Sequence, residues 1–297
     1  MLCAEQSSGK SAGERDVDAV CESWLAYRKE NAAAMLAYGR WLELRRGDVS
    51  GAEECYRIAI EHGRQKTHWL TRAPFSDNCR QWFEAKDRVW IQARALNRLA
   101  VLLHSVHNKS EAAEAAWNEA HRVDPKYVEA YLAHAQMLAK SADRCQEAEG
   151  LLRTALAVNS SHVPVLFECA KLLHHAKTEP YEAERMYRRC LREAPHHVGA
   201  LSQYAMLLGK TLKDDSAALG MCKRALALEP DNVDVLSLYA RLVFDTQGDY
   251  AEAERVLVGV LERDLSCVDA LYHYGRLLQE VTHPRSRADA LSRACYA

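Results

Sequence analysis

Glycine and proline are scarce in this sequence, which has 13 glycines and 7 prolines among 297 residues. So few turn-forming residues argue against a β-sandwich or a barrel, and against a disordered chain. An excess of one charge is also lacking, because 39 lysines and arginines face 41 aspartates and glutamates. No basic excess draws the chain toward nucleic acid or an anionic membrane, so we expect no direct nucleic-acid partner.

Long apolar runs and paired cysteines are missing as well. The longest purely apolar run, Ala32 to Tyr38, is far shorter than the roughly 18 residues that cross a bilayer, so no membrane span is expected. The first residues show neither the pattern of a secretory signal nor many arginines. The ten cysteines form no Cys-x-x-Cys motif and read as free thiols. We expect a cytoplasmic location, and this expectation leaves a place in a cytoskeletal or ciliary assembly open.

Motifs of catalysis and metal binding are absent too. Gly9-Lys10-Ser11 lacks the leading glycine and the preceding strand of a phosphate-binding loop. The adjacent histidines at 174–175 and 196–197 would point in different directions on a helix, so they are interpreted as surface residues at helix ends. We therefore predict a non-enzymatic protein with no cofactor and no metal site.

Small and apolar residues do recur every 35 positions, which indicates an internal repeat. Other series keep the same phase at fixed offsets: mostly leucine four residues before and three residues after the small residue, and alanine thirteen residues after it. Because several series share one phase, an internal repeat explains the recurrence of these residues. The small residues are Ala100, Ala135, Ala170, Ala205, Ala240 and Gly275.

Each repeat has the spacing of two helices. Between Val163 and His197 the apolar residues lie three, four and seven positions apart, and a break before Pro180 divides them into two stretches. Proline suits a first helical turn, where its missing N–H would be unpaired anyway. Ala170 and Ala183 would let the two helices approach closely. Two helices in 35 residues predict an all-α solenoid of stacked antiparallel hairpins.

The small and large positions resemble those of the tetratricopeptide repeat (TPR) family. This resemblance implies a right-handed superhelical solenoid of seven hairpins, in which the first helices line a concave wall. In that family the wall binds an extended peptide or a helix of a partner protein. The residues that match all five positions in one unit are Ala100, Ala113, Trp117, Ala120 and Pro125.

A related family remains an alternative. The segment from Ala183 to Leu191 resembles the second helix of half-a-TPR repeats, and Trp24-Leu25-Ala26-Tyr27 resembles their first helix. That resemblance implies an RNA-processing scaffold. The near-neutral charge favours the first interpretation, because RNA-directed proteins usually carry a basic stripe.

The repeat phase also divides the chain. We predict a flexible tail at 1–14, a leading helix and first hairpin at 15–63, an aromatic-rich insertion at 64–92, and six further hairpins in one continuous solenoid at 93–297. The insertion either packs inward over the groove or an edge, or forms an aromatic docking surface. Its aromatic residues are Trp69, Phe75, Trp82, Phe83 and Trp90.

The leading functional hypothesis is an interaction scaffold or adaptor within a multiprotein complex. Its wall would bind a protein partner as an extended peptide or a helix, and the wall cations favour an acidic segment. Alternatively these cations only neutralise Glu168, Asp234 and Asp269 on a solvated face. We expect no clamp for acidic chaperone tails, because Val101 stands where asparagine is needed. The predicted partner-binding residues are Arg40, Phe167, Lys171, Gln203, Arg241, Tyr272 and Arg276.

The last segment of the sequence gives a final hypothesis. The sequence stops in or just after the expected fourteenth helix, and nothing follows to cover Leu291, Ala294 and Cys295. This end is interpreted either as a docking surface for another subunit or as an ordinary helix terminus.

Overall fold

The computed structural model describes residues 32–70, 79–176 and 179–282, and all regular structure within them is helical. The chain divides into two compact units, Met1–Val158 and Asn159–Ala297. The tail predicted at 1–14, the leading helix at 15–29 and the last segment with Leu291 lie outside the described residues. The predicted all-α fold class is confirmed, and no helix in the described ranges is long and apolar enough to cross a membrane.

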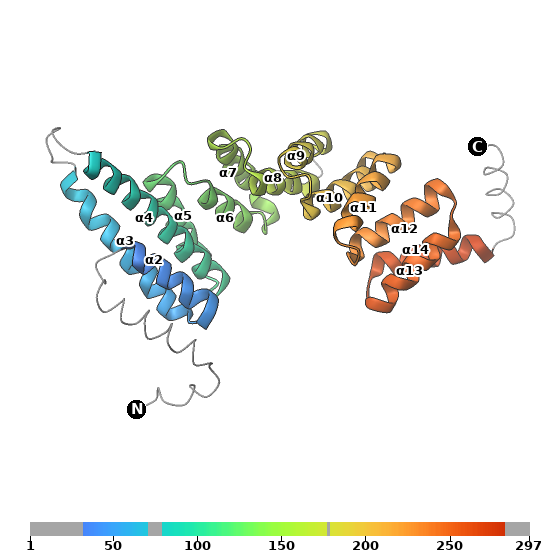
Figure 1. The fold of residues 1–297 in the computed structure, drawn as a ribbon, viewed down its shortest axis with the longest axis horizontal. Coiled ribbons are helices and arrows are strands. Elements are labelled where there is room, and N and C mark those ends of the chain that lie inside the picture. Colours follow the sequence, from blue (N-terminus) through green and yellow to red (C-terminus); the bar gives the residue numbers. More distant parts are fainter. Residues whose placement is uncertain (1–31, 71–78, 177–178, 283–297) are drawn as a thin grey trace, which may run out of the picture. The chain divides into compact units, whose positions relative to one another are not determined.

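The described part of the first unit forms three helix hairpins, which Figure 1 shows side by side. In each hairpin the two helices pack against each other, and each hairpin packs against the next. Short π and 3₁₀ segments, η1 and η2, adjoin two of the helices. The elements are α2 (Ala32–Trp41), η1 (Leu42–Arg46), α3 (Val49–Leu70), α4 (Cys79–Ser105), α5 (Ser110–Val123), α6 (Val128–Leu138), η2 (Ala142–Arg144) and α7 (Cys145–Val158).

The second unit repeats the same plan in three hairpins, followed by one more first helix. Pro180 stands at the first turn of a second helix, as its missing N–H predicts. The elements are α8 (Val163–Ala176), α9 (Pro180–Glu193), α10 (Val198–Met206), η3 (Leu207–Leu212), α11 (Asp215–Leu228), α12 (Val233–Gln247), α13 (Tyr250–Arg263) and α14 (Val268–Thr282).

The 35-residue series form the core of both units. Ala170 and Ala183 are fully buried, as expected for residues where two helices of a hairpin approach closely. At the position twenty residues after the small residue, Ala120, Cys190 and Val260 are also fully buried. Helices can approach this closely only where bulk is lacking, and the large residue three positions earlier fills the adjoining space. The 35-residue periodicity of small residues therefore reflects the close packing of the two helices in each hairpin.

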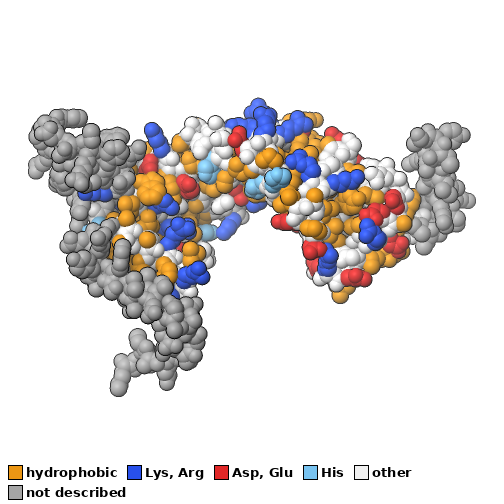
Figure 2. Space-filling view, in the orientation of Figure 1, with side chains coloured by type: hydrophobic (Ala, Val, Ile, Leu, Met, Phe, Trp, Pro, Cys, Tyr) orange, Lys and Arg blue, Asp and Glu red, His pale blue; other side chains and the backbone are white. Residues whose placement is uncertain are grey.

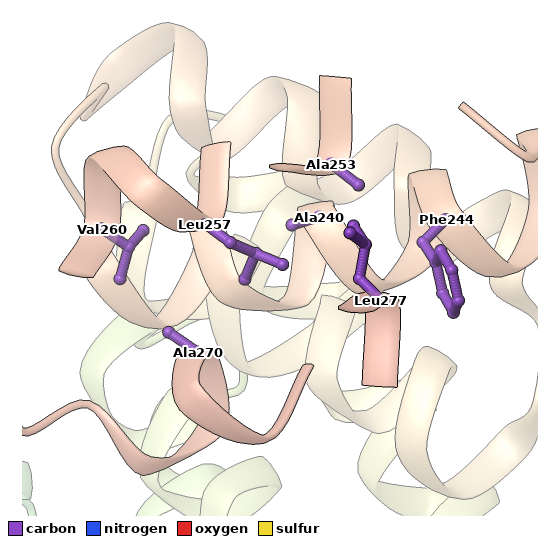
Figure 3. Packing of buried hydrophobic residues seen from close by; sticks show 7 residues of the cluster. All are labelled: Ala240, Phe244, Ala253, Leu257, Val260, Ala270 and Leu277. Atoms are coloured by element: carbon purple, nitrogen blue, oxygen red, sulfur yellow. The ribbon is translucent and has the colours of Figure 1, made fainter. Parts of the chain in front are cut away.

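Figure 3 shows this packing in the last described hairpin. Ala240 on α12 and Ala253 on α13 lie where the two helices meet, and Leu257 fills the space beside them. Leu277 of α14 joins the same cluster, so a first helix also packs on the hairpin before it. Each hairpin thus buries its apolar face only when a neighbour covers it.

Four of the described turns between paired helices contain a left-handed residue. Gly47, Asn108, Lys213 and Gly248 all have φ between 51° and 65°. Each stands eight residues after the small residue of its repeat. The left-handed region is open to glycine and tolerated by asparagine, whereas Lys213 adopts it at a steric cost.

Residues 64–92 mostly lengthen two helices. α3 continues to Leu70, and α4 begins at Cys79 and runs through Trp90. Trp90 is 46% exposed, while residues 71–78 lie outside the described ranges. The long α4 places Trp90 at the edge of the first unit's wall. The division of the chain into segments at 1–14, 15–63, 64–92 and 93–297 otherwise stays a prediction.

Candidate functional site

The first helices of the hairpins adjoin one another within each unit. In the first unit α4 contacts both α2 and α6, and in the second unit α12 contacts both α10 and α14. Residues at the same repeat position of these helices therefore share one surface. We call the surface formed by the first helices the wall of each unit.

The wall of the first unit is hollowed into a groove. A cavity of about 400 Å³ lies between α2 and α4, and a second of about 360 Å³ adjoins it toward α6. Arg40, Trp90, Arg94 and Arg98 line both cavities. We call these two connected cavities the arginine groove. Figure 2 shows lysine and arginine side chains on the visible face of this unit.

Among the residues that the structure describes, the three arginines of the groove have no acidic partner. The guanidinium of Arg94 lies 4.2 Å from the centre of the Trp90 ring. Within the described ranges, no carboxylate lies within 4.0 Å of Arg40, Arg94 or Arg98. Glu43, which follows on the next turn from Arg40, instead accepts a 2.7 Å hydrogen bond from the Tyr56 hydroxyl. These three guanidinium groups therefore carry positive charge that no carboxylate of the described residues contacts.

The positive charges of these arginines affect the pKa values of two nearby tyrosines. Burial raises the pKa of Tyr56, and its hydrogen bond to Glu43 raises it further, whereas Arg98 and Arg40 act in the opposite direction. Burial likewise raises the pKa of Tyr127, against the effect of Arg94 and Arg98. Nearby cations favour a phenolate, so the arginine charges act on both tyrosines, of which Tyr127 lines the groove.

A hydrogen-bonded network supports the floor of the groove. The indole N–H of Trp117, which is 1% exposed, donates a 2.8 Å hydrogen bond to Asn97 Oδ1. The Asn97 amide in turn donates to the Tyr127 hydroxyl at 3.4 Å. Asn97 is 7% exposed, so its polar groups are satisfied inside the fold. Asn97 therefore links α5, α4 and Tyr127 beneath the wall and has a structural role.

Several cations on the wall of the second unit are paired with acids. Lys171 contacts Glu168 at 3.4 Å, and Arg241 contacts Asp245 at 3.2 Å. Asp245 also accepts from Arg276 at 3.1 Å. The predicted neutralisation of Lys171 by Glu168 is thus present, whereas Arg241 and Arg276 use Asp245 in place of Asp234 and Asp269. The remaining pairs are Arg241 with Asp215 at 3.6 Å, Lys210 with Asp269 at 2.9 Å and Arg276 with Glu280 at 4.0 Å.

The predicted partner-binding residues fall in two places. Arg40 lies in the first unit, and the other six lie in the second unit. The ring of Phe167 packs 4.9 Å from His197, and the side chain of Gln203 is half-buried. Tyr272 is 63% exposed. Arg241 and Arg276 are brought together by their common partner Asp245.

Sequence reasoning missed three residues of the groove: Trp90, Arg94 and Arg98. Arg94 and Arg98 stand six and two residues before the small residue Ala100. These are wall positions in the other repeats, so the repeat register itself was the signal that could have identified them. Trp90 was recognised only as part of the aromatic segment.

No group of three or more histidine, cysteine, aspartate or glutamate side chains in the described residues could hold a metal ion. His197 has a structural role: its Nδ1 accepts the backbone N–H of Ala200 at 3.0 Å and caps α10. Burial raises the pKa of the Cys55 thiol to about 11 and that of Cys222 to about 12. These thiols are buried parts of the core and lack the thiolate character of reactive cysteines.

Repeated two-helix hairpins with a common wall define the class of α-solenoid repeat proteins. Residues 213–277 match the family profile described as tetratricopeptide repeat. The predicted resemblance to the tetratricopeptide repeat family is thus supported in this stretch by the profile, and the fold of the chain is the one seen in solved structures of that kind. No curated protein sequence matches the chain. Proteins of this family are in general non-enzymatic and bind other proteins.

Solved structures show the same fold at low sequence identity. PilF of Pseudomonas aeruginosa is 18% identical, with 84% of this chain and 97% of that chain covered and a TM-score of 0.64. A chain of the Cut9–Hcn1 hetero-tetramer of the APC/C is 16% identical, with a TM-score of 0.62, and the match covers 89% of this chain but 46% of that one. YrrB, described as a TPR protein with an unusual peptide-binding site, is 19% identical over 61% of this chain and 90% of its own, with a TM-score of 0.50.

Proposed function

We propose that this protein is a non-enzymatic scaffold or adaptor that binds a segment of a partner protein on the wall of its first helices, as part of a larger assembly. The observation that carries the proposal is the arginine groove, an open cavity on the wall with three arginines that lack acidic partners in the described residues. Arg94 and Arg98 are half-buried, whereas Arg40 is exposed. A half-buried cation without a paired acid is stabilised when a ligand supplies the opposite charge.

The neighbouring structures support the same kind of function. The description of YrrB names a peptide-binding site, and Cut9–Hcn1 is a hetero-tetramer of the APC/C. Binding of a partner segment and membership in an assembly are therefore functions found on this fold. For this chain they are proposals, and a cytoplasmic location belongs to the same proposal.

Affinity capture with two matched triple variants tests the proposal. The wall variant combines Arg40→Ala, Lys171→Ala and Tyr272→Ala. Native cell extract is passed over the native protein and the variant, and the bound proteins are identified by mass spectrometry. We expect the wall variant to lose one or more partners that the native protein retains.

The control variant also replaces two cations and one tyrosine, but on second helices: Arg57→Ala on α3, and Tyr181→Ala with Arg185→Ala on α9. These side chains are exposed, so we expect the control to retain the native partners. Equal retention by both variants would contradict binding on the wall. Partners that disappear from every sample after ribonuclease treatment would instead favour the RNA-processing scaffold.

A further inference from the structure

The two walls differ in how their positive charges are balanced. In the second unit Lys171, Arg241 and Arg276 all contact carboxylates of the same wall. In the first unit Arg40 and Arg98 contact none among the described residues, and Arg94 lies over Trp90. An anionic ligand would have to displace acids from the second wall, whereas the first wall is ready to accept one.

The spacing of the arginines matches an extended peptide. Arg94 and Arg98 stand one turn apart on α4, so their side chains leave the helix about 6 Å apart. Alternate side chains of an extended chain are separated by about 7 Å. Two acidic residues at positions i and i+2 of an extended peptide can therefore each meet one guanidinium. Arg40, from α2, lines the same groove and can contact the peptide from the other side.

The remaining lining of the groove favours a ligand that has an apolar side chain next to its acidic residues. Leu36, Ala33, Ala37 and Ile91 line the cavity between α2 and α4, and the Trp90 ring is 46% exposed. An aliphatic side chain placed there would remove apolar surface from water. A phosphate backbone offers no such group.

Acidic residues at the far end of the groove also discriminate between ligands. Asp124 and Glu129 line the cavity toward α6, together with Lys126. A nucleic-acid strand carries a phosphate at every residue and would bring some of them against these carboxylates. A short acidic segment can end before it reaches them. The chemistry therefore favours a peptide with two or three carboxylates over a continuous polyanion.

We infer that the arginine groove binds an extended acidic peptide segment, with two carboxylates two residues apart on Arg94 and Arg98 and a neighbouring aliphatic side chain against Trp90. This inference rests on the proposed function and names the partner chemistry of one of its two walls. Guanidinium forks hold carboxylates through paired, charge-assisted hydrogen bonds. The Trp90 ring keeps the Arg94 guanidinium oriented toward the groove.

A peptide-binding measurement tests this inference. The probe is a short fluorescein-labelled peptide with aspartate and glutamate two positions apart beside a leucine, and its anisotropy is followed during titration with the full chain. We expect Arg94→Glu with Arg98→Glu to weaken binding by about tenfold or more. The control, Arg57→Glu with Arg122→Glu, changes the net charge equally on second helices and should bind like the native protein.

Further samples keep the result interpretable. Arg94→Gln with Arg98→Gln removes charge without reversing it and should give an intermediate loss, while circular dichroism verifies the fold of each variant. A peptide with asparagine and glutamine in place of the acids should bind about tenfold more weakly, and Trp90→Ala should weaken the leucine-containing peptide most. Equal binding of the neutral peptide would overturn the inference.

Failure of the inference can be told apart from failure of the proposed function. If the wall variant loses its captured partners but Arg94→Glu with Arg98→Glu binds the acidic peptide like the native protein, the inference falls and the scaffold function stands. Preferential binding of a single-stranded RNA oligonucleotide in the groove would also overturn it. If the wall variant loses no partner, the proposed function itself falls.

Discussion

The stability of the first unit should fall on mild acidification because of a buried histidine pair. His121 on α5 and His134 on α6 approach at 3.3 Å between Nε2 and Nδ1. The His121 ring stacks on Tyr131 with centroids 4.0 Å apart, and His134 stacks on Trp117 at 5.3 Å. Burial lowers the pKa of His121 to about 4, and the neighbouring His134 lowers it further in the same direction. The pKa of His134 is lowered by burial as well.

The sign and size of the effect follow from proton linkage. In the unfolded chain His121 takes up a proton near its ordinary pKa of 6.5, whereas in the folded unit it does so only near 4. A depressed folded pKa means that the stability is present above pH 6.5 and is lost as the pH falls toward 4. From pH 7.5 to 5.5 the free energy of unfolding should drop through His121 by at most about 1.4 kcal/mol, and by less to the extent that solvent screens this half-buried ring.

Tryptophan fluorescence isolates this unit, because all six tryptophans of the chain lie within residues 1–158. Urea unfolding is followed at pH 7.5 and 5.5 for the native protein and for His121→Phe, which preserves an aromatic ring against Tyr131. We expect the native loss of stability on acidification to exceed that of the variant by about 1 kcal/mol. The control is His196→Gln, an exposed position of the second unit, which should behave like the native protein. The same pH dependence in His121→Phe and in the native protein would refute the reasoning.

Three further predictions concern glycines and a strained turn. A Cβ at Gly39 would lie 2.7 Å from the ring of buried Tyr56, so Gly39→Ala should destabilise the first unit by about 1–3 kcal/mol in tryptophan-detected urea unfolding. Gly150→Ala, in an exposed part of α7 with nothing within 4 Å, should stabilise that unit by about 0.5–1 kcal/mol in the same assay. Lys213→Gly should stabilise the second unit by up to about 1 kcal/mol in unfolding followed by circular dichroism, because φ is 60° there. A destabilised Lys213→Gly protein would show that its side chain, and not the turn geometry, decides.

The fold could be predicted because each repeat has the same packing requirement. A fixed series of small residues leaves room for helix contacts, and buried residues such as Ala100, Ala170 and Ala240 appear at that position in both units. The break before Pro180 marked a true helix start. Repetition makes such signals additive, so many weak local preferences point to one architecture.

The wall was harder to predict, because its pairing depends on side-chain reach between hairpins. Asp245 meets Arg276, 31 residues away, and Lys210 meets Asp269, 59 residues away. Neither spacing is visible as a helical neighbour in the sequence. A long side chain at a known wall position lies within reach of several acids. Helix packing and side-chain rotamers determine which of them it contacts. Register therefore predicts which residues face the wall, and the structure supplies which of them are paired.

Two repeat positions show where charge compensation comes from. Arg241 and Arg276 each have an acid four residues later, Asp245 and Glu280, and Lys171 has Glu168 three residues earlier. At the equivalent positions the first hairpin has leucine and alanine, and the second has serine and arginine. The first and second hairpins thus lack acids at the two repeat positions that supply them in the second unit. The positive groove therefore follows largely from the repeat sequence: no acid stands three or four residues from Arg94 or Arg98, and Glu43, three residues after Arg40, is bound by the Tyr56 hydroxyl.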